Sequence, residues 1–172
     1  MDRLNPSMQS TQTYNSYMQS TQTYNFRISN DVKNLNNNDL PEVIQDVHIN
    51  DTNILGPHIF TLIGPTETPY EGGKFQLELN IPEKYPFLPP QLKFITRIYH
   101  PNIAIDGTIC LDILKNQWSA ALKLNSVILS LSALLANPNP DDPLDVTVAK
   151  IYKSDINLFK QNAKDFTKKY AN

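Results

Sequence analysis

The sequence predicts an α+β fold, in which helices and strands occupy separate stretches of the chain. Apolar residues near position 28 recur at helical spacing. Between residues 43 and 96, four short apolar segments are separated by turn residues, which indicates four strands. Helical spacing then returns from residue 127 to the C-terminus. Because the loops between the strands are short, we expect an N-terminal helix, a four-stranded antiparallel meander, and then a central helix and C-terminal helices.

The N-terminal stretch, residues 1–25, is polar and contains the sequence MQSTQTYN twice, at residues 8–15 and 18–25. Two short copies are too few for a repeat architecture. The apolar content is also too low to offset the entropy that is lost on ordering. We therefore expect a disordered low-complexity tail, with a targeting or docking tail as the alternative, and a folded domain over residues 26–172.

The folded domain begins with Ile28, Val32 and Leu35, which form the apolar stripe of a short amphipathic helix. The asparagine run at residues 36–38 and the following Pro41 predict the end of this helix.

The four strands are predicted from the next apolar segments. Residues 43–49 alternate loosely, residues 58–63 form a short apolar run, and residues 75–81 alternate cleanly between apolar and polar side chains. The fourth strand is predicted at residues 91–96. His58 lies within the second segment, and we expect it to be a structural residue.

A rigid extended connection, YPFLPP at residues 85–90, separates the last two strands. We expect one of its X-Pro bonds to be cis. Phe87 stands between prolines that cannot join a sheet, so we expect its side chain to be exposed. An exposed aromatic side chain on a rigid loop is a good anchor for a partner protein. The alternative is that Phe87 covers the end of the core.

The central helix is predicted from apolar residues spaced three and four apart between positions 127 and 135. Asn125 or Ser126 is the predicted N-cap, and Pro138 is the predicted stop.

Two further helices are predicted after an acidic, turn-rich loop at residues 137–143. The first is short and lies near residues 146–152. The second begins at Ser154 or Asp155, and its apolar residues step by three and four toward the C-terminus.

The chain contains a single cysteine, Cys110. A lone cysteine is either a small buried hydrophobic residue or a reactive thiol. His100 and Asn102 precede it, Asp112 follows it, and turn residues lie between them. An imidazole, an amide and a carboxylate near a thiol are the groups that acyl transfer uses. The nearest cationic residue after the thiol is Lys115, so the sequence predicts no close cationic partner that would strongly activate it.

The stretch HPNIAIDGTICLDIL, with YPFLPP before it and PNPDDP after it, resembles the core of ubiquitin-conjugating enzymes. The Cys stands eight residues after the Asn of HPN. The resemblance runs from about residue 26 to the C-terminus and is closest to the subgroup that elongates ubiquitin chains. Some members of that subgroup carry an extra C-terminal ubiquitin-binding domain, for which we expect no room in a chain that ends at Asn172.

The resemblance implies the ubiquitin-conjugating fold and a thioester mechanism. Cys110 would accept ubiquitin from the activating enzyme and pass it to a lysine amine. Asn102 would either donate to the oxyanion or order its loop, and Asp142 would orient and help to deprotonate the incoming lysine. The alternative for Asp142 is a solvated turn. Supporting roles in the same site are implied for His100, as a structural residue, and more weakly for Asp112 and Asn139.

The resemblance also implies that Phe87 docks a RING, U-box or HECT type ligase, together with a second loop that contains Ser119 and Ala120. Many family members have Pro where this chain has Ala120, so we expect a different ligase preference. The first helix of the family docks on the activating enzyme and on ligases through basic residues. Only Arg27 and Lys33 are basic in this helix here, which puts the strength of those contacts in question.

Composition narrows the remaining classes of function. The net charge of −2 gives no support for nucleic-acid binding, and no apolar run approaches the roughly 18–20 residues that span a bilayer. One cysteine and no signal region indicate a reducing compartment, so we expect a cytoplasmic or nuclear protein. We expect no metal and no cofactor, because three His and one Cys make no convincing metal cluster and ATP belongs to the upstream activating enzyme.

Three alternatives to a ubiquitin carrier stay open at this point. The chain could carry another ubiquitin-like modifier, or it could be a non-catalytic scaffold of the same fold. It could also be a cysteine hydrolase that uses Cys110, His100 and Asn102, although such enzymes usually place the His far from the Cys in sequence.

Overall fold

A computed structural model describes residues 26–35, 40 and 42–172. Within these residues the fold is the predicted α+β arrangement, with a helix over residues 26–35 followed by four strands and then by the remaining helices. The three apolar residues of the first helix, Ile28, Val32 and Leu35, are all buried. The proposed N-terminal tail, residues 1–25, and the predicted end of this helix at residues 36–38 and Pro41 lie outside the described residues.

The sheet contains β1 (Ile44–His48), β2 (His58–Ile63), β3 (Lys74–Asn80) and β4 (Gln91–Phe94) in sequential antiparallel order, as predicted. The alternation in β3 places Phe75, Leu77 and Leu79 in the core. β4 is shorter than predicted because the N–H groups of Ile95 and Thr96 both donate to the carbonyl of Gln76. Two successive N–H groups on one carbonyl end the regular ladder.

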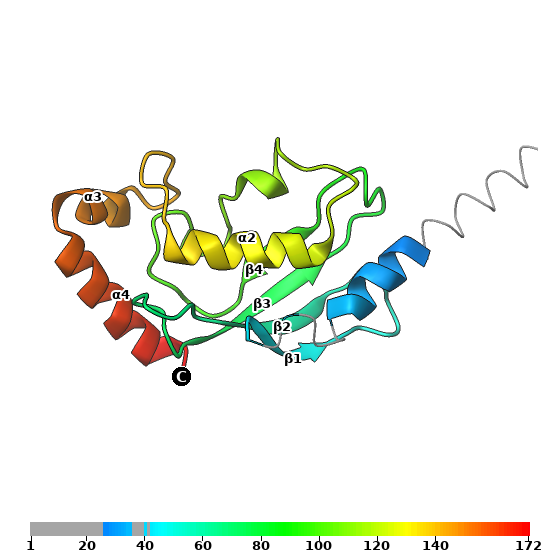
Figure 1. Ribbon diagram of the computed structural model, residues 1–172, viewed down its shortest axis with the longest axis horizontal. Helices are drawn as coiled ribbons and strands as arrows, with labels where there is room; N and C mark the ends of the chain where they lie inside the picture. The colour runs from blue at the N-terminus through cyan, green and yellow to red at the C-terminus, as the bar shows by residue number, and fades with distance from the viewer. Residues whose placement is uncertain (1–25, 36–39, 41) are drawn as a thin grey trace, which may run out of the picture.

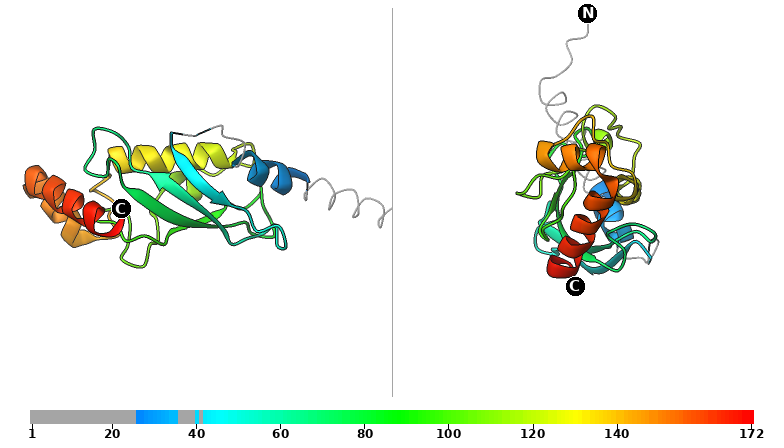
Figure 2. Two further views of the ribbon diagram at one scale, coloured as in Figure 1. Left: turned by 90° about the horizontal axis from the view of Figure 1, so that it is seen from below. Right: turned by 90° about the vertical axis from the view of Figure 1, so that its left-hand side faces the viewer.

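The central helix α2 (Leu124–Ala136) lies across one face of the sheet (Figures 1 and 2). Its buried side chains include Val127, Ile128, Leu131 and Leu135, which complete the core. The predicted N-cap is wrong. Lys123 is the N-cap and makes no side-chain hydrogen bond there. Asn125 and Ser126 lie within the first turn of the helix.

The C-terminal helices, α3 (Val146–Ser154) and α4 (Ile156–Tyr170), lie at the end of the molecule opposite the first helix (Figure 2). Asp155 caps α4 by accepting from the N–H groups of Asn157 and Leu158, which confirms one of the two predicted caps. α4 is fixed to the sheet where the N–H of Lys74 donates to the carbonyl of Ala171 at 2.6 Å. In the described part of the chain, no helix combines the length and the apolar character that crossing a membrane requires.

Candidate active site

The loop before Cys110 closes on itself. The N–H of Cys110 donates to the carbonyl of Asn102 at 2.9 Å, so the seven intervening residues, 103–109, form a closed loop that brings these two residues side by side. Gly107 makes the turn possible because its φ of +87° lies in the left-handed region. A Cβ at this position would also lie 2.0 Å from the carbonyl oxygen of Phe94. The loop geometry therefore requires glycine.

His100 is buried, and both of its ring nitrogens bond to the backbone. Its Nδ1 accepts from the N–H of Asn102 at 3.0 Å, so Nε2 carries the proton and donates to the carbonyl of Leu134 at 3.0 Å. Burial lowers the pKa of His100 from 6.5 to about 4, and the hydrogen bond to Leu134 opposes this shift. Both ring nitrogens are therefore engaged away from the thiol. This geometry does not support a hydrolase that uses His100 as its base.

The buried side chain of Asn102 bonds its own loop to the acidic loop, residues 137–143. Its Nδ2 donates to the carbonyls of Asn139 at 2.7 Å and Asp142 at 3.0 Å, and its Oδ1 accepts from the N–H of Asn139 at 2.8 Å. Both amide hydrogens of Asn102 are thus already used. The arrangement is that of a residue which orders two loops, one of the two roles that the sequence left open for it.

Cys110 is 8% exposed, and its sulfur lies between two charged side chains. The thiol donates to Oδ2 of Asp142 at 3.4 Å, and Nζ of Lys115 donates to the sulfur at 3.0 Å. The structure thus brings the three predicted catalytic residues together, with Asn102 bonded to the backbone of Cys110 and Asp142, 32 positions further along the chain, bonded to its sulfur.

The position of Lys115 corrects the expectation that the thiol has no close cationic partner. A single 3₁₀ turn, η1 (Asp112–Leu114), reverses the chain after Cys110, so Lys115 points back to the sulfur. The hydrogen bond to Cys110 raises the pKa of Lys115, and the charges of Cys110, Asp142 and Asp112 act in the same direction. The sequence signal that could have indicated this contact is the spacing of five residues across one short turn.

A groove of about 370 Å³ leads away from the thiol along α2. We call it the thiol groove. One side is lined by the segment around Cys110 and Asp112, and the other by residues from α2 and the segment before it, including Ser130 and Leu134. The predicted supporting residues Asp112 and Asn139 are exposed and contribute to this lining.

The two predicted ligase-docking loops lie next to each other. Phe87 is 79% exposed, as expected, and the predicted cis bond occurs between Tyr85 and Pro86. Trp118 joins the two loops because its Nε1 donates to the carbonyl of Pro86 at 2.7 Å. The following residues present the exposed Ser119 and the half-buried Ala120 beside this connection.

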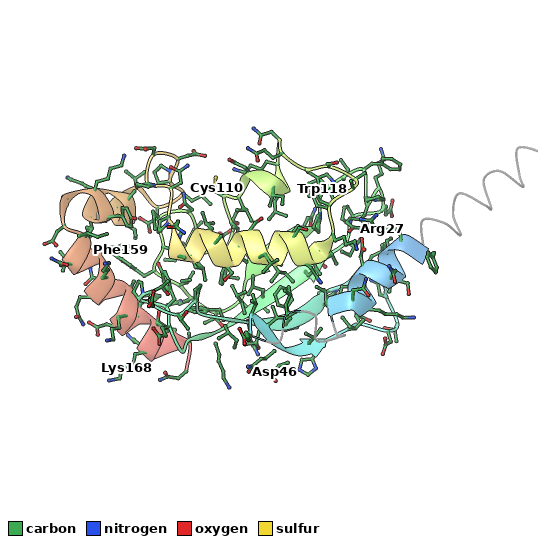
Figure 3. The ribbon with its side chains drawn as sticks, in the orientation of Figure 1. Arg27, Asp46, Cys110, Trp118, Phe159 and Lys168 are labelled. Atoms are coloured by element: carbon green, nitrogen blue, oxygen red, sulfur yellow. The ribbon has the colours of Figure 1, made fainter. Side chains whose placement is uncertain are left out.

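The half-buried side chain of Arg27 contacts the second of these loops. Its Nη2 donates to the carbonyl of Leu122 at 2.7 Å, and its Nε pairs with the carboxylate of Asp31, one turn further along the first helix. This hydrogen bond raises the pKa of Arg27. Asp31 is buried and also accepts from the hydroxyl of Tyr85 at 2.6 Å. Figure 3 shows Arg27 and Trp118 at the same end of the molecule, while Cys110 lies nearer its middle.

No group of three or more His, Cys, Asp and Glu side chains suited to a metal ion occurs among the residues that the structure describes.

The comparison with known proteins assigns this fold and its thiol site to a family. A family model described as ubiquitin-conjugating enzyme matches residues 27–167, so the chain belongs to the ubiquitin-conjugating enzyme family.

Among curated proteins, the ubiquitin-conjugating enzymes E2 K of Homo sapiens, Bos taurus and Mus musculus are each 57% identical to this chain over 111 residues. This region is 64% of the chain but 56% of each relative, so the match spans little more than half the length of these proteins.

Solved structures of the same family match the fold. The E2 domain of a Toxoplasma gondii ubiquitin-conjugating enzyme is 39% identical with a TM-score of 0.78, and covers 87% of this chain and 99% of its own. A ubiquitin-conjugating enzyme of Plasmodium yoelii is 46% identical with a TM-score of 0.77, and covers 85% and 94%. The predicted fold class and the predicted family are therefore confirmed.

Proposed function

We propose that this chain accepts ubiquitin from the activating enzyme as a thioester on Cys110 and transfers it to a lysine amine with the help of a ligase. The observation that carries the proposal is the sulfur of Cys110 at the head of an open groove, 3.4 Å from the carboxylate of Asp142. A thiol is suited to both steps, because it attacks an activated thioester readily and leaves readily when an amine attacks.

The thiol groove is suited to the acyl group that Cys110 would carry. Its lining extends from Cys110 to Leu122. Leu111, Leu122 and Leu134 supply apolar contacts, and Ser130 supplies a hydroxyl. An extended peptide whose C-terminal carboxylate forms the thioester fits such a groove, and we propose that the tail of ubiquitin occupies it.

Asp142 acts on the incoming amine in this proposal. Its carboxylate is exposed and lies beside the sulfur, so it can hold the lysine at the thioester or accept its proton. Asn102 supports this arrangement by holding the acidic loop in place. Asp142 and Asn102 fill these two roles without a cofactor. ATP serves the activating enzyme.

The partners that we propose are ubiquitin, its activating enzyme, protein substrates and a RING, U-box or HECT type ligase. The exposed Phe87, with Ser119 and Ala120 beside it, is the surface that we assign to the ligase. Arg27 supports that surface through Leu122, in place of the direct contact that the resemblance implied. We propose a cytoplasmic or nuclear location, where the activating enzyme and reduced thiols occur together.

The test is a charging assay. The protein is mixed with ubiquitin, ATP and a ubiquitin-activating enzyme, and products are separated on a non-reducing gel. We expect an adduct that reducing agent removes and that Cys110→Ser converts to a stable ester. An adduct with another modifier but none with ubiquitin would change the proposed cargo. The absence of an adduct with every modifier would overturn the carrier function in favour of a scaffold.

A further inference from the structure

The sulfur of Cys110 loses one of its two hydrogen bonds when the thiol ionises. In the thiol form, the S–H donates to Asp142 while the sulfur accepts from Lys115. Removal of the proton ends the first interaction and leaves a thiolate facing a carboxylate at 3.4 Å. Among the described residues, Lys115 is then the side chain that donates to the sulfur.

Asn102 does not supply a second donor in this structure. Its two amide hydrogens are directed at the carbonyls of Asn139 and Asp142. A negative charge on the sulfur therefore relies on the ammonium of Lys115, which lies 3.0 Å away and is brought there by the η1 turn. The raised pKa of Lys115 is consistent with an amine that stays charged beside the sulfur.

We propose that Lys115 is a catalytic residue that stabilises negative charge on Cys110 Sγ, both as the thiolate attacks during loading and as it departs during transfer. The inference rests on the proposed carrier function and adds a residue to its mechanism.

The two steps place the same charge on the same atom. In loading, the Cys110 thiolate attacks the thioester carbon of the activating enzyme. A new C–Sγ bond forms, the old C–S bond breaks, and the other sulfur leaves as a thiolate. In transfer, a neutral lysine amine attacks the carrier thioester. A C–N bond forms, the C–Sγ bond breaks, the Cys110 thiolate leaves, and the amine proton passes to Asp142 or to water. An ammonium beside Sγ stabilises the Cys110 thiolate that attacks during loading. It also stabilises the Cys110 thiolate that leaves during transfer.

The size of the effect is limited by exposure, because the Lys115 side chain lies at the surface. We therefore expect a change of roughly twofold to fivefold when the charge is removed, as is typical of an ion pair that is partly exposed to solvent. Salt should reduce the difference, since exposed pairs are screened.

The first experiment measures the thiol without any partner. Iodoacetamide alkylates the thiolate, so its rate at neutral pH reports how much negative charge the sulfur carries. We expect Lys115→Met to slow alkylation roughly twofold to fivefold, by the same reasoning, and the difference to vanish at high pH where every thiol is ionised. Lys115→Arg should retain the wild-type rate. Lys160→Met, which removes an exposed lysine from α4, is the matched control and should change nothing. Equal rates for Lys115→Met and wild type would overturn the proposal.

The second experiment measures transfer in a single turnover, from enzyme loaded with ubiquitin to free lysine. We expect Lys115→Met to lower the rate at saturating lysine with little change in the lysine concentration at half-maximal rate. If Lys115→Met changes only the lysine concentration at half-maximal rate and alkylates normally, Lys115 only contacts the acceptor lysine. That result would overturn the proposal. Failure of the carrier function itself is distinguishable, because alkylation requires neither ubiquitin nor the activating enzyme.

Discussion

Substitution of Asn102 by alanine tests whether this residue acts through structure or by direct contact with the oxyanion. The change removes three hydrogen bonds, of 2.7, 3.0 and 2.8 Å, that join the loop before Cys110 to the acidic loop. A buried hydrogen bond contributes about 1 kcal/mol to stability, so we expect the free energy of unfolding to fall by about 3 kcal/mol. We also expect the acidic loop to open more often and to carry Asp142 away from the sulfur.

Urea unfolding measures the first effect, and amide hydrogen exchange across residues 137–143 measures the second. Asn157→Ala, at an exposed position early in α4, is the matched control and should leave both measurements unchanged. Discharge of carried ubiquitin to free lysine should slow in Asn102→Ala in proportion to the exchange of the acidic loop.

A different result would refute this reasoning. An oxyanion donor acts only in the transition state, where its loss typically lowers the rate by roughly 100- to 1000-fold. If Asn102→Ala unfolds at the same urea concentration as wild type, with unchanged exchange in the acidic loop, and yet loses transfer by such a factor, Asn102 donates to the oxyanion and the loop-ordering role is wrong.

Three further predictions concern pH, the docking loops and the thiol groove. His100 has a folded pKa of about 4, below its unfolded value near 6.5. Its contribution to the free energy of unfolding is therefore complete above pH 6.5 and is lost as the pH falls toward 4. Urea unfolding should show that this free energy falls by about 2 kcal/mol between about pH 7.5 and pH 5. Tyr85→Phe removes the 2.6 Å hydrogen bond to Asp31 and should lower the free energy of unfolding by about 2 kcal/mol. It should also weaken the binding of a ligase domain while leaving charging intact. Unchanged ligase binding would show that Asp31 does not support the docking loops. Ser130→Arg fills the thiol groove and should slow loading and transfer without weakening ligase binding, and unimpaired loading would exclude the groove as the site of the ubiquitin tail.

Local patterns predicted the elements of this fold well. The strict alternation around Leu77 places every second side chain in the core, because the strand has a period of two. The stripe of Ile28, Val32 and Leu35 predicted the first helix for the equivalent reason at helical spacing. Asp155 was a predictable cap because its side chain bonds to N–H groups only two and three positions ahead.

The contacts within the site were less predictable, because they join segments that are distant in sequence. Asn102 bonds to groups 37 and 40 positions away, and Arg27 reaches a carbonyl 95 positions away. No local pattern encodes such pairs. Lys115 is a separate case, since it is close in sequence and its contact with Cys110 depends on the short η1 turn. The sequence identified the residue as the nearest cation but did not indicate the direction of its side chain.

The central helix connects the two regions to which we assign functions. The predicted docking loop that contains Ser119 leads directly into the N-terminus of α2, whereas His100, just before the closed loop of Cys110, bonds to the carbonyl of Leu134 near the C-terminus of α2. A helix of 13 residues is about 20 Å long at 1.5 Å per residue, so a ligase domain seated on the docking loops need not approach the sulfur. The thiol groove, however, is lined by Leu122 before α2 and by Ser130 and Leu134 within it. A bound ubiquitin tail would therefore extend from the sulfur toward the ligase surface. The geometry favours a ligase that acts on the carried ubiquitin through this groove, while Lys115 and Asp142 act at the thioester and Asn102 holds the acidic loop in place.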